Sequence, residues 1–222
     1  MRKISKISKL KVLITIVASA IVLCGCGQSE KAEDSNSVDV TSSVQEAVEN
    51  VELLTGKHYV DIVIKDKGTI SVELDADVAP VSVTNFVKLA KEGFYDGVTF
   101  HRIIEGFMMQ GGDPTGTGSG GAGETIKGEF SANGVENTLS HTRGAISMAR
   151  SKDNDSASSQ FFIVHQDSVY LDGEYACFGY VTEGMEIVDD ICENTKGGDA
   201  NGIIPVGNRP VIETIKVVEN NK

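Results

Sequence analysis

Two runs of β-branched residues, 59–64 and 69–74, lie four residues apart and constrain the fold more than any other feature. In the second run Ile70, Val72 and Leu74 alternate with polar residues, so one face of a strand would be apolar and the other polar. The residues between the runs, Lys-Asp-Lys-Gly, favour a tight turn. The sequence therefore predicts an antiparallel hairpin at the start of the folded part of the chain.

Further short segments of the same kind follow, with two helical patterns among them. Pro80 opens an amphipathic pattern that stops at Gly93, and a second, shorter one covers residues 185–192. The other predicted strands are residues 99–104, 145–149, 161–165, 176–181 and 211–218. The 24 glycines and 4 prolines agree with many tight turns. Many short strands and two isolated helices predict a mainly β fold, a closed antiparallel β-barrel capped by two α-helices.

The N-terminal residues have the pattern of an export signal. Residues 1–11 carry five basic residues and no acidic one, and residues 10–23 are almost purely apolar. Such a stretch is short for a membrane span but suits the apolar region of a signal peptide. It ends in Leu-Cys-Gly-Cys, which resembles a bacterial lipobox with Gly25 before the cysteine that receives the lipid. We expect Cys26 to be lipidated, and a simple signal peptide or an uncleaved anchor are the alternatives.

These signals divide the chain into three parts. Residues 1–25 are expected to be a lipoprotein signal peptide, 26–56 a lipidated cysteine with a flexible acidic spacer, and 57–222 the folded domain. The expected location is extracytoplasmic, anchored by the Cys26 lipid to the bacterial cell membrane. Both a Gram-positive surface and a Gram-negative envelope agree with this arrangement.

The charge balance argues against nucleic acid as a partner. The formal net charge is −12, and removing residues 1–25 takes away five positive charges and no negative one, which leaves −17. Phosphate backbones and anionic bilayers repel such a protein. We expect a monomer whose membrane contact is the lipid. Cys177 and Cys192 are too few for a disulfide framework, and two buried thiols or one bridge are both compatible with them.

Three segments are rich in side chains that a structural strand does not require. They are residues 100–113 (FHRIIEGFMMQGGD), residues 143–150 with 159–163 (RGAISMAR and SQFFI), and residues 170–179 (YLDGEYACFG). With these segments in this order and spacing, the chain resembles the cyclophilin family of peptidyl-prolyl cis-trans isomerases from about residue 58 onward. The resemblance implies an eight-stranded antiparallel barrel with a helix at each open end. It also implies proline-containing polypeptides as substrates and no metal or other cofactor.

The resemblance gives roles to individual residues. Arg102 matches the arginine that polarises the prolyl nitrogen, and Gln110 matches the glutamine that steadies it and bonds the substrate backbone. The substrate-binding positions are matched by Phe107, Met108, Ala149, Arg150, Gln160, Phe162, Leu171 and Tyr175. Rotation about an X–Pro bond breaks amide resonance, with a barrier of about 18–20 kcal/mol. A dry pocket and a guanidinium donor suit this reaction, although each residue taken alone fits a core or surface position equally well.

Four positions depart from the best-known eukaryotic pattern. Tyr175 replaces a histidine of the pocket wall, and Tyr170 replaces a tryptophan that helps to bind cyclosporin. Arg150 replaces an asparagine, and its charge is expected to favour acidic residues beside the proline. Glu105 replaces a turn proline and is expected to face solvent. Arg102 is retained, so we expect activity to survive.

Other patterns do not indicate a second chemistry. Residues 116–121 fit GxGxxG but lack the preceding strand and following helix that dinucleotide binding requires. The four histidines have no zinc-ligand spacing. The leading hypothesis is a prolyl isomerase that accelerates folding of exported proteins. The alternative is a module that binds proline segments, or a chaperone, with incidental turnover.

Overall fold

The computed structural model describes residues 52–218. The predicted hairpin is present in it as two neighbouring strands of a single sheet. β1 (Lys57–Ile64) pairs antiparallel with β2 (Gly68–Asp75), and Ile62 lies opposite Ile70. Asp66 in the turn has φ 60°, a left-handed conformation that aspartate tolerates better than most residues. The predicted signal peptide, Cys26 and most of the spacer lie outside the described residues.

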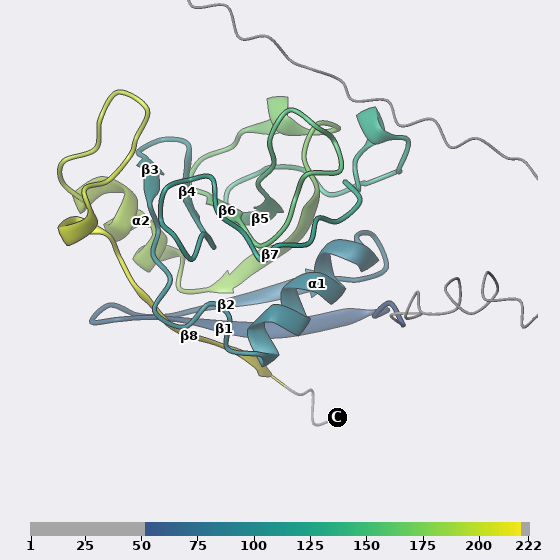
Figure 1. Ribbon diagram of the computed structural model, residues 1–222, viewed down its shortest axis with the longest axis horizontal. Helices are drawn as coiled ribbons and strands as arrows, with labels where there is room; N and C mark the ends of the chain where they lie inside the picture. The colour runs from purple at the N-terminus through teal and green to yellow at the C-terminus, as the bar shows by residue number, and fades with distance from the viewer. Residues whose placement is uncertain (1–51, 219–222) are drawn as a thin grey trace, which may run out of the picture. The chain divides into compact units, whose positions relative to one another are not determined.

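The sheet has eight antiparallel strands in the order β3-β4-β6-β5-β7-β2-β1-β8 (Figure 1). The other six strands are β3 (Arg102–Ile104), β4 (Met108–Gly111), β5 (Ala145–Met148), β6 (Phe161–Val164), β7 (Cys177–Glu183) and β8 (Ile212–Val218). The apolar pattern predicts seven of the eight strands. It misses β4, because the four residues Met-Met-Gln-Gly show no alternation and follow a glycine turn.

The prediction of a closed barrel is wrong, because the sheet curls into a half-barrel that stays open. Within residues 52–218 the edge strands β3 and β8 form no ladder with each other. An isolated bridge between Thr99 and Val211 joins the segments that precede these two strands. β3 is only three residues long, and Pro210 before β8 has no N–H to donate, so a continuous ladder cannot form there.

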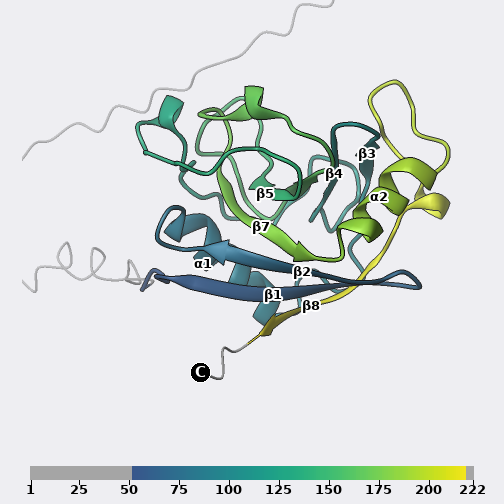
Figure 2. The same cartoon turned by 180° about the vertical axis from the view of Figure 1, so that it is seen from behind.

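The two predicted helices pack on the curled sheet toward its opposite ends (Figures 1 and 2). α1 (Pro80–Lys91) packs against β2 and β8, and α2 (Met185–Asn194) against β2 and β4. No side chain at the N-cap of α1 satisfies its first amides. Glu129, 2% exposed, instead accepts the N–H groups of Val81 and Ser82 at 2.8 Å each and the Ser82 hydroxyl at 2.7 Å. A carboxylate at a helix N-terminus also interacts favourably with the helix dipole.

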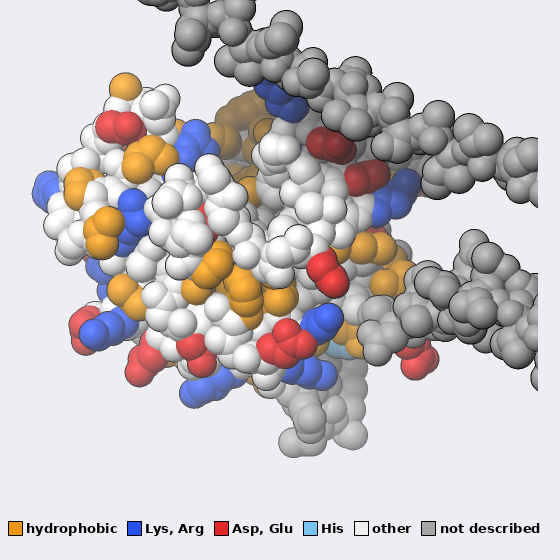
Figure 3. All heavy atoms as spheres, viewed as in Figure 1, with side chains coloured by type: hydrophobic (Ala, Val, Ile, Leu, Met, Phe, Trp, Pro, Cys, Tyr) orange, Lys and Arg blue, Asp and Glu red, His pale blue; other side chains and the backbone are white. Residues whose placement is uncertain are grey.

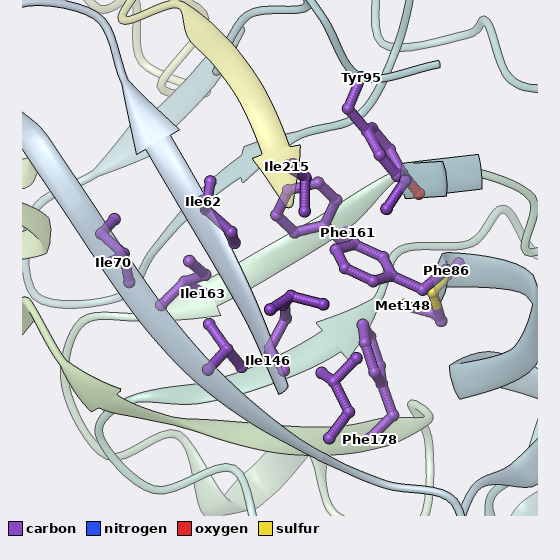
Figure 4. Packing of buried hydrophobic residues seen from close by; sticks show 14 of the residues in the cluster. Ile62, Ile70, Phe86, Tyr95, Ile146, Met148, Phe161, Ile163, Phe178 and Ile215 are labelled. Carbon is purple, nitrogen blue, oxygen red and sulfur yellow. The ribbon is translucent and has the colours of Figure 1, made fainter. Parts of the chain in front are cut away.

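Aromatic side chains fill the core between α1 and the sheet (Figure 4). The Phe86 ring of α1 meets that of Phe161 edge-on at 5.2 Å and lies 5.3 Å from that of Phe178. Edge-to-face contacts at such distances add to the stability that burial alone provides. These contacts therefore fix the positions of β6 and β7 relative to α1.

The two described cysteines, Cys177 and Cys192, are free thiols in the interior. Burial raises the pKa of each thiol to about 12, so both stay protonated at neutral pH. Of the two alternatives left open by the sequence, the structure has the unbridged one. Within residues 52–218, neither helix combines the length and apolar character that a membrane span needs.

Candidate active site

Strands β3 and β4 bring Arg102 and Gln110 together, because the register of this pair sets them directly opposite each other. Arg102 Nη1 donates to Gln110 Oε1 at 3.3 Å, and Arg102 Nε donates to the carbonyl of Asn201 at 2.9 Å. Two anchors on different sides of the guanidinium fix its plane. A planar fork held in this way presents its remaining N–H groups in one direction.

A chain of side-chain amides continues from Gln110 into the neighbouring loop. Gln110 Nε2 donates to Gln160 Oε1 at 2.9 Å, and Gln160 Nε2 donates to the carbonyl of Gly120 at 2.8 Å. Arginine can only donate, so Gln110 must turn its oxygen toward Arg102 and its NH₂ toward Gln160. The same reasoning fixes Gln160 against Gly120. The direction of every bond from Arg102 to the loop is therefore determined.

Beside the guanidinium lies a cavity of about 230 Å³ with an apolar floor. Met108 and Phe162 are 1% and 5% exposed, and they come from neighbouring strands β4 and β6. Nine of the ten predicted catalytic and substrate-binding residues line this cavity: Arg102, Phe107, Met108, Gln110, Ala149, Arg150, Phe162, Leu171 and Tyr175. The structure thus gathers into one place residues that are up to 73 positions apart in the sequence.

Gln160, the tenth predicted residue, lines a second and more polar cavity of about 310 Å³ next to the first. Gly118, Ser119 and Gly120 form one side of it. The two cavities share three lining residues, Gln110, Ala149 and Arg150. An extended peptide can therefore place neighbouring residues in the two cavities at once.

Arg150 is one of the three residues that line both cavities. Its guanidinium carbon lies 4.9 Å from the Phe130 ring centre and 4.8 Å from that of Tyr175, and its side chain is 11% exposed. Its nitrogens donate to the carbonyls of Glu174 and Ser151 at 2.9 and 3.0 Å, and Nη2 lies 3.4 Å from the Glu174 carboxylate. This arrangement leaves little of the guanidinium for an acidic substrate residue.

Behind the cavity floor, His141 stacks on Phe162 with ring centres 6.0 Å apart. His141 Nδ1 lies 2.7 Å from Asp172 Oδ1, and Nε2 lies 3.0 Å from Ser147 Oγ. Burial lowers the pKa of His141, and Asp172 offsets this only in part. We therefore assign a neutral ring that donates from Nδ1 to Asp172 and accepts the Ser147 hydroxyl at Nε2.

Two of the positions that depart from the eukaryotic pattern lie at the rim. Tyr170 is 68% exposed, and its ring centre lies 6.0 Å from that of Phe107, so it extends the apolar surface outward. Glu105 is exposed in the turn between β3 and β4, as expected from the sequence. Its carboxylate makes no described hydrogen bond with Arg102.

Sequence reasoning missed several residues that hold the site together. They are Phe130 beneath Arg150, His141 behind Phe162, and the backbone carbonyls of Asn201 and Gly120. A carbonyl group is present in every residue, so no sequence signal marks the two that matter here. Among residues 52–218, histidine, cysteine and carboxylate side chains nowhere form a group suited to a metal ion.

Comparisons with known proteins point to one family. A family model described as cyclophilin type peptidyl-prolyl cis-trans isomerase/CLD matches residues 59–219. The chain is 48% identical over 136 residues to peptidyl-prolyl cis-trans isomerase B of Bacillus subtilis, a match that covers 61% of this chain and 89% of that protein. It is 49% identical over 128 residues to a peptidyl-prolyl cis-trans isomerase of Helicobacter pylori, covering 57% and 76%.

Solved structures give the same result. A crystal structure of a Cryptosporidium parvum cyclophilin-type isomerase superimposes with a TM-score of 0.65 at 33% identity, covering 74% of this chain and 99% of that one. A second structure of that protein, in the presence of the dipeptide Ala-Pro, gives a TM-score of 0.64 at 34% identity and covers 73% and 99%.

Proposed function

The chain belongs to the cyclophilin-type peptidyl-prolyl cis-trans isomerase family, and we propose that its isomerase activity depends on Arg102 beside the 230 Å³ cavity. The observation that carries this proposal is the guanidinium fixed between Gln110 and the Asn201 carbonyl at the edge of an apolar floor. The substrates are X–Pro bonds of polypeptides.

In this mechanism the proline ring enters the cavity over Met108 and Phe162, and the amide to be rotated lies beside Arg102. Rotation breaks amide resonance and returns the electron pair to the prolyl nitrogen. A donor that bonds this nitrogen is bound more strongly in the twisted state than in the planar one, because the nitrogen lone pair is available only when resonance is broken. Only such differential binding accelerates the step, so no covalent bond to the protein is needed.

The test is a protease-coupled or NMR exchange assay of an Ala-Pro peptide with the full-length protein. Arg102→Ala should lose most of the activity, and Arg102→Lys should recover little of it, because an ammonium cannot hold both anchors. Lys88→Ala, at an exposed position of α1, is the control for a lost positive charge. An unchanged rate in Arg102→Ala would refute the mechanism. Peptide binding without acceleration in the wild type would favour a binding module.

We also propose that the enzyme acts outside the cytoplasm on exported proteins, held to the membrane through lipid on Cys26. The support is the resemblance of residues 23–26 to a lipobox and the acidic spacer that follows. Cys26→Ala should abolish incorporation of labelled fatty acid and move the protein from the membrane fraction to the medium or soluble fraction. Cys24→Ala is the matched control and should stay lipidated. Retention of Cys26→Ala in the membrane would contradict the anchor.

A further inference from the structure

His165, the residue after β6, holds the turn that carries Phe107. Its side chain is 3% exposed. Its backbone N–H donates to the Phe107 carbonyl at 2.8 Å, and its ring atom Nδ1 lies 2.9 Å from the backbone nitrogen of Gly106. One residue therefore bonds two consecutive residues of the turn, one through the backbone and one through the imidazole.

The partners of the ring determine where its proton lies. The Gly106 amide can only donate, so Nδ1 must be the unprotonated acceptor. The ring proton then sits on Nε2, which lies 3.3 Å from Asp189 Oδ1 on α2. Asp189 also accepts two bonds of 2.7 Å from Arg143, and Arg143 Nη1 donates to the His165 carbonyl at 2.8 Å.

The turn is short, and a further backbone bond closes it, from the Phe107 N–H to the Ile104 carbonyl at 3.0 Å. It has three residues between β3 and β4, and Gly106 in the middle has φ 76°, in the left-handed region that favours glycine. Phe107 follows directly and lines the cavity, with its ring centre 6.0 Å from the Arg102 guanidinium carbon. A shift of the turn therefore moves a wall of the cavity and a neighbour of Arg102 together.

We propose that His165 is a positioning residue for substrate binding, which holds Phe107 in place as long as its ring is neutral. The proposal rests on the role of the cavity given above. An imidazolium has N–H groups on both nitrogens, so a protonated His165 would oppose the Gly106 N–H with a second donor. The turn then loses its side-chain anchor and keeps only the backbone bond from His165 to Phe107, so the affinity for proline peptides falls.

The charged groups around the ring act on different sides of it. Asp189 faces Nε2 at 3.3 Å, and Arg143 lies on the carbonyl side of the residue. Glu105 in the same turn is exposed, and Asp167 accepts the Arg143 backbone N–H at 2.8 Å. At Nδ1 the Gly106 amide is the described partner. Protonation therefore acts on the turn through this one contact.

The test compares the full-length wild type with His165→Asn and His165→Ala. Asparagine places an oxygen near the position of Nδ1 and can accept the Gly106 N–H, but it does not titrate. The dissociation constant of an Ala-Pro peptide is measured by calorimetry, and KM and kcat are measured in the isomerase assay, at pH 8 and pH 5, the range that brackets histidine titration. His58→Asn, on β1 outside both cavities, is the matched control.

We expect the dissociation constant and KM of the wild type to rise about fivefold or more from pH 8 to pH 5, with kcat little changed. His165→Asn should recover most of the affinity that His165→Ala loses and should show no such pH dependence, whereas His58→Asn should behave as the wild type. Since His141 also lies behind the cavity, the decisive comparison is the pH slope of wild type against His165→Asn.

A long-range ¹H–¹⁵N NMR spectrum of the wild type adds a readout that needs no variant. It should show Nδ1 of His165 unprotonated at pH 8, and the Gly106 amide signal should move between pH 8 and pH 5. The same pH slope in wild type and His165→Asn, or a proton on Nδ1 at pH 8, would overturn the proposal. If Phe107→Ala left the affinity unchanged, the assignment of the cavity itself would fail, and that outcome is separate.

Discussion

Replacing Gln110 by glutamate changes one NH₂ group to an oxygen and should reduce kcat/KM for an Ala-Pro peptide strongly. The new carboxylate keeps an acceptor for Arg102 Nη1, now 3.3 Å from a full negative charge, so the guanidinium is attracted away from the substrate. Its second oxygen takes the place of Gln110 Nε2, which now donates to Gln160 Oε1 at 2.9 Å. Two acceptors would then face each other and repel. Gln160 can turn its amide round only by losing the Gly120 carbonyl.

The size of the effect follows from the interaction that Arg102 loses. A hydrogen bond to a charged group contributes about 1.5–3 kcal/mol, and each 1.36 kcal/mol in the activation free energy is a factor of ten in rate. Loss of one such bond in the twisted state therefore predicts roughly a tenfold to 150-fold reduction in kcat/KM. The reduction should lie mainly in kcat, because the apolar floor of the cavity is unchanged.

The assay is the isomerisation of an Ala-Pro peptide by the full-length protein, with unfolding curves to confirm that each variant is folded. Gln110→Met keeps the length of the side chain without any charge and should lose less than Gln110→Glu, because it leaves the guanidinium free of a competing anion. Asn194→Asp converts an exposed amide outside both cavities to a carboxylate and should leave the rate unchanged. A loss of less than about threefold in Gln110→Glu would refute the reasoning about the direction of these bonds.

Three further predictions concern other contacts. Glu129→Ala removes three bonds from the N-terminus of α1 and should lower the free energy of unfolding by about 2–4 kcal/mol in urea titrations, with a smaller loss for Glu129→Gln. Arg150→Asn should change the ratio of kcat/KM between Glu-Pro and Ala-Pro peptides by less than about threefold, because the guanidinium already has its partners. Burial and Asp172 together leave the pKa of His141 below its ordinary value, so below about pH 6.5 the unfolded chain binds a proton that the folded one does not. The free energy of unfolding should therefore fall as the pH drops through this range, and His141→Gln should weaken the fall.

The sequence predicts the strands that alternate and the helices that are amphipathic, because one face of each must be buried. Ile70, Val72 and Leu74 are all at most 1% exposed, as their alternation predicts. β4 gives no such signal, since Met108 and Met109 are consecutive and both buried. Closure of the sheet could not be predicted either. It depends on whether two edge strands meet in register, and Pro210 and the three-residue β3 act against it at one place.

For the site, the sequence identifies which side chains gather but not which way they are held. Which way the side-chain amides of Gln110 and Gln160 face is not visible in the sequence. Arg102, which can only donate, sets their direction at one end, and the carbonyl of Gly120, which can only accept, sets it at the other. The role of His165 is hidden from the sequence for the same reason. It depends on the backbone N–H of Gly106, and every residue except proline has a backbone N–H. The sequence thus identifies the side chains of the site, whereas the backbone groups of Asn201, Gly120 and Gly106 determine how these side chains are oriented.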